Sequence, residues 1–73
     1  MDLEAHFQSF GARVRYFRHI RGLSQEELSK VTGLERKTIS RLETGAGSTS
    51  LRTVYTVADA LQVEPLELFV EEK

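Results

Sequence analysis

The stretch GLSQEELSKVTGLERKTISRLETG, residues 22–45, predicts two short helices separated by a three-residue turn. Ser24 and Glu27 have the spacing of a capping box, in which each side chain accepts a hydrogen bond from the other residue's backbone N–H, so a helix is expected to begin there. Gly33 is expected to end this helix after two turns, and Gly45 to end the next one. Two short helices this close together are typical of a helix-turn-helix unit.

Apolar residues at helical spacing predict three further helices, so the expected fold is all-α with five helices. Steps of 4, 3, 4 and 3 residues predict a first helix that ends at Gly22, with one buried stripe of Leu3, Phe7, Phe10, Val14 and Phe17. The fourth helix is expected to begin at Ser50, with an inner stripe of Leu51, Val54, Ala58 and Leu61. The fifth is expected near Glu64, with Pro65 at its first position, where the missing backbone N–H has no intrahelical partner to lose.

The length and composition indicate one soluble domain over residues 1–73. The chain has no cysteine, which excludes disulfides and thiolate metal sites and is typical of a reducing compartment. No apolar run approaches the roughly 18 residues of a membrane span. The first residues, MDLEAHF, lack the basic and then apolar order of a signal peptide. We therefore expect a cytoplasmic protein with no membrane contact.

Charge is distributed unevenly along the chain, although the net charge is only −1. Residues 1–10 carry two acids and no base, residues 11–41 carry eight bases and three acids, and residues 42–73 carry two bases and six acids. A basic middle third between acidic ends favours a polyanionic partner that binds one surface. Chance clustering of charges on solvated helices is the alternative interpretation.

The chain resembles the phage-repressor and Cro type of helix-turn-helix domain, the XRE family. The matching residues are RxxRGLSQEEL, GL and ISRLETG, followed by SLRTVYTVADALQV, and they cover roughly residues 10–69. Glu35 and the loop GAGSTS depart from common members of the family. The resemblance implies a compact five-helix, lambda-repressor-like domain with its helix-turn-helix at about residues 24–44 and a dimerisation region at about residues 51–70.

The function implied by the resemblance is sequence-specific transcriptional regulation by a homodimer on double-stranded DNA with a near-palindromic operator. The helix over residues 36–44 then lies in the major groove. Four side chains share an arc of about 140° on that helix and are assigned to base readout: Arg36, Lys37, Ser40 and Arg41. The planar arginine fork matches guanine O6 and N7, and Thr38 is a weaker candidate for a thymine methyl contact. Taken alone, these residues also fit a solvated basic face.

Phosphate contacts are expected from two loops beside this helix. By the resemblance, Gln25 bonds a phosphate and supports the recognition helix, where exposed N–H groups at a helix start form an anion site. Ser48, Thr49 and Ser50 precede the fourth helix and offer donors to a second phosphate, although plain N-capping explains Ser50 equally well. Arg13 is a further candidate, with a solvated charge as its alternative state.

Two structural roles complete the predicted site. The resemblance implies that Arg18 pairs with Glu43 across the first and third helices and fixes the recognition helix on its scaffold. The last two helices carry more apolar residues than they can turn inward. We therefore hypothesise a symmetric homodimer interface formed by Tyr55, Leu66, Phe69 and Val70.

No enzyme motif is present in the sequence. His6 and His19 lie thirteen residues apart without metal-ligand spacing, and there is neither a Gly-rich phosphate loop nor a nucleophile elbow. We expect no catalytic activity, no metal and no cofactor.

Several regulatory contexts remain open. The layout resembles both controller proteins of restriction–modification systems and minimal phage or plasmid repressors. Glu26 and Glu27 fit an acidic contact with RNA polymerase and, equally well, an ordinary helix N-terminus. Two other classes are an antitoxin that also binds a toxin protein and a protein-interaction module without DNA binding.

Overall fold

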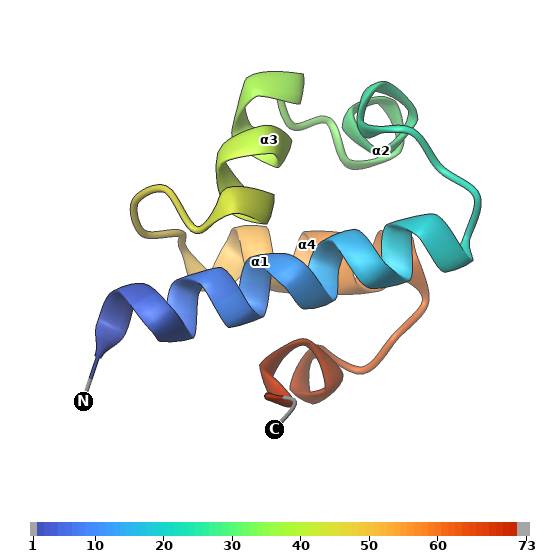
Figure 1. The fold of residues 1–73 in the computed structure, drawn as a ribbon. Coiled ribbons are helices and arrows are strands. Elements are labelled where there is room, and N and C mark those ends of the chain that lie inside the picture. The colour runs from blue at the N-terminus through green and yellow to red at the C-terminus, as the bar shows by residue number, and fades with distance from the viewer. Residues whose placement is uncertain (1, 72–73) are drawn as a thin grey trace.

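The computed structural model describes residues 2–71 and is all-helical. In chain order its elements are α1 (Leu3–Ile20), α2 (Gln25–Thr32), α3 (Arg36–Thr44), α4 (Leu51–Leu61) and the 3₁₀ helix η1 (Pro65–Phe69). Figure 1 shows α1 running across the molecule, with α2 and α3 on one side of it and η1 on the other, and α4 behind. Residues 1, 72 and 73 of the expected single domain lie outside the described part.

The prediction of a fifth α-helix is wrong, because the last element is a 3₁₀ helix of five residues. The segment begins at Pro65, and Val70 directly after it is already extended with φ −75° and ψ 121°. Between these two residues there is no room for a ladder of α-helical hydrogen bonds. The segment still turns Leu68 fully into the core. The described fold is therefore four α-helices and one 3₁₀ helix.

The capping box that was expected at the start of α2 is present. The Ser24 hydroxyl accepts from the Glu27 N–H at 3.0 Å, and the Glu27 carboxylate accepts from the Ser24 N–H at 2.8 Å. The Ser24 backbone N–H is the main cause that lowers the pKa of Glu27 below its usual value. Because the folded-state pKa is lowered, the capping contribution is present above the usual carboxyl pKa and is lost as the pH falls through the folded-state value.

The hydrophobic core takes residues from every element. Its buried members are Phe10, Val14, Leu28, Ile39, Leu42, Val54, Val57, Ala58, Leu61 and Leu68. Two residues that were expected to face inward are exposed: Leu3 by 57% and Leu51 by 72%. Each lies in the first turn of its helix, at the end of the core, and in α4 the fully buried Val57 completes the inner stripe instead. Helical spacing therefore predicted the buried faces but not where along each helix the core ends.

Helix α1 crosses α3 at a distance that leaves no space for a side chain at residue 11. A Cβ atom on Gly11 would lie 2.4 Å from the carbonyl oxygen of Leu42 and 2.6 Å from that of Glu43. Gly45, which ends α3 in the left-handed region with φ 76°, meets α1 as closely, since its Cβ would lie 2.8 Å from the backbone N of Gln8. The position of α3 is therefore set by direct contact between two backbones.

Candidate nucleic-acid interface

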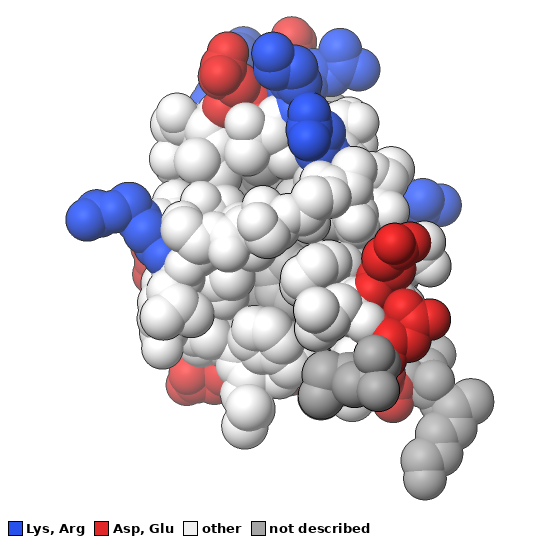
Figure 2. Space-filling view, turned by 90° about the vertical axis from the view of Figure 1, so that its left-hand side faces the viewer, with Lys and Arg blue, Asp and Glu red and all other residues white. Residues whose placement is uncertain are grey.

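Helix α3 has one buried and one exposed face. Ile39, Leu42 and Glu43 are buried, whereas Arg36, Lys37 and Arg41 are exposed, and Thr38 and Ser40 are half-buried. Figure 2 shows Lys and Arg side chains gathered at the top of the molecule, at the level of α2 and α3, with most of the acidic side chains in this view lower down. The exposed face of α3 is thus a cationic surface on a helix that the core holds in place.

A cleft of about 330 Å³ opens between the start of α2 and the exposed face of α3. The side chains that line it are Gln25, Arg36, Lys37, Ser40 and Arg41. All five had been assigned to DNA contact from the sequence, and the structure brings them together in one open site. Thr38 lies at the other flank of α3, beside Arg41 and the loop that follows.

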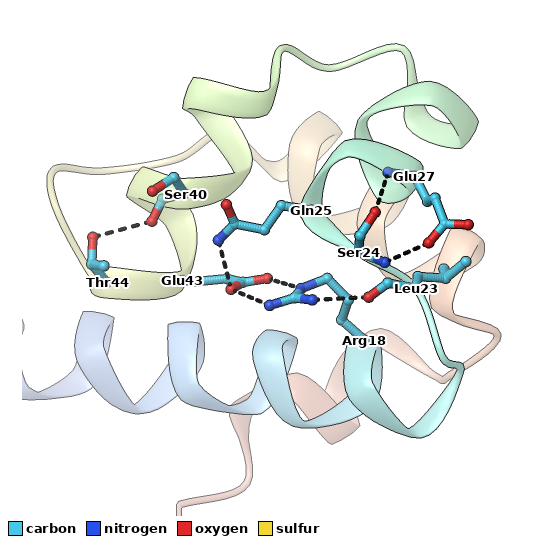
Figure 3. Close-up of polar contacts among 8 residues, drawn as sticks. All are labelled: Arg18, Leu23, Ser24, Gln25, Glu27, Ser40, Glu43 and Thr44. Carbon is cyan, nitrogen blue, oxygen red and sulfur yellow. Dashed lines mark hydrogen bonds and ion pairs between the residues drawn. The ribbon is translucent and has the colours of Figure 1, made fainter.

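The expected ion pair between Arg18 and Glu43 is present beneath this cleft (Figure 3). Arg18 donates from Nε to Oε2 of Glu43 at 2.5 Å and from Nη2 to Oε1 at 3.0 Å, in a bidentate arrangement. Its Nη1 also donates to the Leu23 carbonyl at 2.8 Å. The pair is only 8% and 6% exposed, and no buried side-chain N or O atom within residues 2–71 lacks a hydrogen-bond partner. The buried charges are therefore fully paired.

Gln25, which was expected to support the recognition helix, joins this network through a partner that sequence reasoning had not identified. Its Nε2 donates to Oε1 of Glu43 at 3.1 Å, so Glu43 connects α1, α2 and α3 (Figure 3). No pattern in the sequence indicated this bond, because the two residues lie 18 positions apart on different helices. A glutamine amide has two N–H bonds, and the bond to Glu43 uses one of them. The side chain is half-buried and held at the edge of the cleft.

The loop between α3 and α4 presents three exposed hydroxyl side chains, those of Ser48, Thr49 and Ser50. Ser50 is the N-cap of α4, and its hydroxyl accepts from the Thr53 N–H at 3.1 Å. Ser48 and Thr49 line a second cleft of about 330 Å³ together with Arg41. The two loop residues therefore lie beside α3, and the capping role that was considered for Ser50 is present.

The structure does not place Arg13 near α3. Its Nε donates to the Glu67 carbonyl of η1 at 3.2 Å, and its guanidinium carbon lies 4.9 Å from the ring centroid of Phe17. Since η1 packs on the side of α1 opposite α3 (Figure 1), we leave Arg13 out of the DNA contacts. Arg21 is also engaged elsewhere, donating to the Leu61 carbonyl at 2.7 Å. The basic middle third therefore does not form one surface.

An apolar surface lies on α4 and η1. Each residue that was assigned to the dimer interface is at least half exposed: Tyr55, Leu66, Phe69 and Val70. A cavity of about 490 Å³ opens beside Phe69, with an apolar lining that includes Leu3, Leu51 and Val54. We call the six exposed residues of this set the apolar face: Leu3, Leu51, Tyr55, Leu66, Phe69 and Val70.

The two histidines lie near opposite ends of α1. His6 contacts Glu71, and His19 lies near the other end of α1, about 20 Å away at the helical rise of 1.5 Å per residue. Within the described chain, no three histidine or acidic side chains are grouped so that they would hold a metal ion. None of the helices in that part is long and apolar enough to cross a bilayer.

Known proteins that match this chain share its helix-turn-helix fold. A helix-turn-helix family model, HTH_3, matches residues 14–68. An uncharacterized HTH-type transcriptional regulator of Archaeoglobus fulgidus is 41% identical over 58 residues, which cover 80% of this chain and 83% of the relative. The crystal structure of the restriction–modification controller protein C.AhdI from Aeromonas hydrophila is similar with a TM-score of 0.86 and 42% identity, over 89% of this chain and 98% of the other. The hypothetical transcription factor NHTF from Neisseria has a TM-score of 0.87 and 30% identity, over 97% and 82%.

Proposed function

This chain belongs to the helix-turn-helix family HTH_3, and from this premise we propose that it is a sequence-specific DNA-binding regulator of transcription. The observation that carries the proposal is the exposed face of α3, where Arg36, Lys37 and Arg41 surround the half-buried Ser40. A recognition helix in the major groove contacts base edges with its N-terminal residues, and cationic side chains there also neutralise phosphates. The similarity to proteins named as transcriptional regulators supports this proposal.

The proposed contacts divide between bases and backbone. Base edges face the outer side of α3, with Thr38 at its flank. Phosphates on either side of the groove are bonded by the free amide N–H of Gln25 and by the loop that contains Ser48, Thr49 and Ser50. Phosphate contacts fix the register of the protein on the duplex, whereas contacts with base edges give the sequence preference.

Selection of bound duplexes from a random DNA pool, near physiological salt, tests the proposal. The wild-type protein is expected to enrich one sequence, and the Arg36→Ala/Arg41→Ala variant is expected to lose this enrichment. A good bidentate contact gives about 1–3 kcal/mol of discrimination, so its removal lowers specific affinity by about 5- to 150-fold. The matched control is Arg15→Ala/Lys30→Ala, which removes two exposed cations outside the clefts that α3 lines. A wild-type protein that enriches no sequence would contradict the proposal.

We further propose that the regulator is a homodimer joined through the apolar face. Three large side chains of η1 and the residue after it, Leu66, Phe69 and Val70, remain half or more exposed, and the cavity beside Phe69 extends this surface toward α1. Exposed apolar surface of this kind marks an interaction site. A two-fold dimer presents two copies of α3 about one helical turn of DNA apart, so the expected operator is a near-palindrome.

The variant Leu66→Glu is expected to convert this dimer into a monomer. The Leu66 side chain is 77% exposed, so a charge there leaves the fold of one protomer intact but prevents its burial at an interface. Sedimentation equilibrium at tens of micromolar protein is expected to give a dimer mass for the wild type and a monomer mass for the variant. Val31→Glu, which changes a 62% exposed residue on α2, is the control and is expected to stay dimeric. A monomeric wild type would refute the dimer.

The alternative partners have no structural observation in their favour among residues 2–71. Glu26 and Glu27 are exposed at the start of α2, and Glu27 is engaged in the capping box. This role accounts for Glu27 without an RNA polymerase contact. We include neither the polymerase nor a toxin partner in the proposed function.

A further inference from the structure

The two arginines of α3 lie on different flanks of the helix. They are five residues apart, which is about 140° around the helix axis at 100° per residue. Arg36, in the first turn, lines a cleft with Ser24 and Gln25 at the start of α2. Arg41, in the second half of α3, lines the cleft that is formed with the loop over residues 45–49. Both arginines also line the cleft with Gln25, Lys37 and Ser40, so their surroundings overlap there and differ in the second cleft that each of them lines.

Arg41 lies against the loop. Its Nη2 is 3.5 Å from the place that a Cβ atom of Gly47 would occupy, and its backbone carbonyl accepts from the Ala46 N–H at 2.9 Å. It is the one charged residue among those that line this cleft, where the loop adds the Ser48 and Thr49 hydroxyls. In the described chain, the backbone N–H groups of residues 47–49 form no hydrogen bond with another backbone group. A single cation with neutral donors around it fits one phosphate group.

Arg36 has the surroundings of a residue that contacts bases. It is exposed in the first turn of α3, the part of a recognition helix that meets base edges. Its neighbour in the cleft, Gln25, is held in one orientation by Glu43 and has only one amide N–H left. Arg36 keeps a complete planar fork beside that fixed amide, and this fork matches the O6 and N7 atoms of guanine.

Building on the proposed function, we propose that the two arginines have separate roles. Arg36 determines sequence preference by bonding a guanine, and Arg41 acts with the loop residues Gly47, Ser48 and Thr49 to bind a phosphate of the DNA backbone. This assignment changes the expectation from the sequence, in which both arginines contact guanine. Specificity then depends on the α2 side of the helix and general affinity on the loop side.

The test compares Arg36→Ala and Arg41→Ala with the wild type on three kinds of duplex at several salt concentrations. The duplexes are the selected operator, the same operator with each guanine replaced in turn, and a random sequence. Arg36→Ala is expected to lose about 5- to 150-fold in affinity for the operator and to stop distinguishing one guanine from its replacement. Arg41→Ala is expected to weaken binding to all duplexes by a similar factor and to lower the salt slope by about one.

The variants Arg36→Lys and Arg41→Lys sharpen the test. A lysine supplies a point charge, which suffices for a phosphate but does not reproduce a bidentate contact with guanine. Arg41→Lys is therefore expected to restore most of the affinity, whereas Arg36→Lys is not expected to restore discrimination. An Arg41→Ala protein with altered base preference, or an Arg41→Lys protein as weak as Arg41→Ala, would overturn the assignment. If the proposed function itself is wrong, the wild-type protein prefers no sequence. This result also overturns the assignment and is distinct from a wild-type protein that prefers a sequence but whose arginine variants behave otherwise.

Discussion

Replacing Gly11 by alanine is expected to destabilise the protein by about 3 kcal/mol or more, although alanine is the better helix former. The new methyl group would overlap the carbonyl oxygens of Leu42 and Glu43, at 2.4 and 2.6 Å. Both atoms belong to the backbone of α3, so no side-chain rotation relieves the overlap. The total stability of a 73-residue domain is about 4–11 kcal/mol, so the loss is a large part of it.

Urea unfolding followed by circular dichroism measures this effect. Gly22→Ala is the matched control, because Gly22 has φ 69° but no atom within 4 Å of its Cβ position. That variant carries only the strain of a left-handed backbone, roughly 1–2 kcal/mol. If Gly11→Ala is no less stable than Gly22→Ala, then α1 and α3 are not held as closely as described here.

Glu43→Ala is expected to lower both thermal stability and DNA affinity. The substitution leaves the Arg18 guanidinium buried without its carboxylate and removes the acceptor of the Gln25 amide. Breaking a buried pair on one side costs about 3–5 kcal/mol. For a domain of this size, such a loss lowers the melting temperature by more than about 10 °C. DNA affinity falls as well, because Gln25 and α3 lose the group that holds them in register.

Calorimetry and duplex binding on the same samples test this expectation. Asp59→Ala removes an exposed acid from α4 and is expected to change neither quantity. Arg18→Met/Glu43→Leu removes both charges, so it is expected to regain much of the stability that the single variant loses. An unchanged melting temperature for Glu43→Ala would show that the ion pair does not support α3.

Local patterns predicted most of the fold because local interactions determine where these helices begin and end. The capping box at Ser24 and the left-handed Gly33 and Gly45 lie at the expected ends of α2 and α3. The last segment differed because only five residues precede extended backbone, and apolar spacing does not predict where the chain becomes extended. The exposure of Leu51 depends on where the core ends, which is a property of the whole molecule.

For the candidate site, too, the sequence predicted the features of single helices but not the contacts between helices. The exposed face of α3 follows from the helical period once Ile39 and Leu42 are placed inside. The bond from Gln25 to Glu43 and the removal of Arg13 from the site depend on how separate helices meet, and no local pattern encodes that. Counting charges along the chain also overstated the basic surface, because Arg18 and Arg21 are bonded within the fold.

The two faces of α3 differ in how well they tolerate substitution. Gly11, Arg18 and Glu43 hold the buried side through backbone contact and a closed ion pair, so single substitutions there are expected to cost a large part of the stability. Arg36 and Lys37 are exposed and have no part in the core, and surface substitutions of this kind typically change stability by less than about 0.5 kcal/mol. Under the proposed function, substitutions at Arg36 and Lys37 are therefore expected to change the preferred DNA sequence without a compensating change in the core.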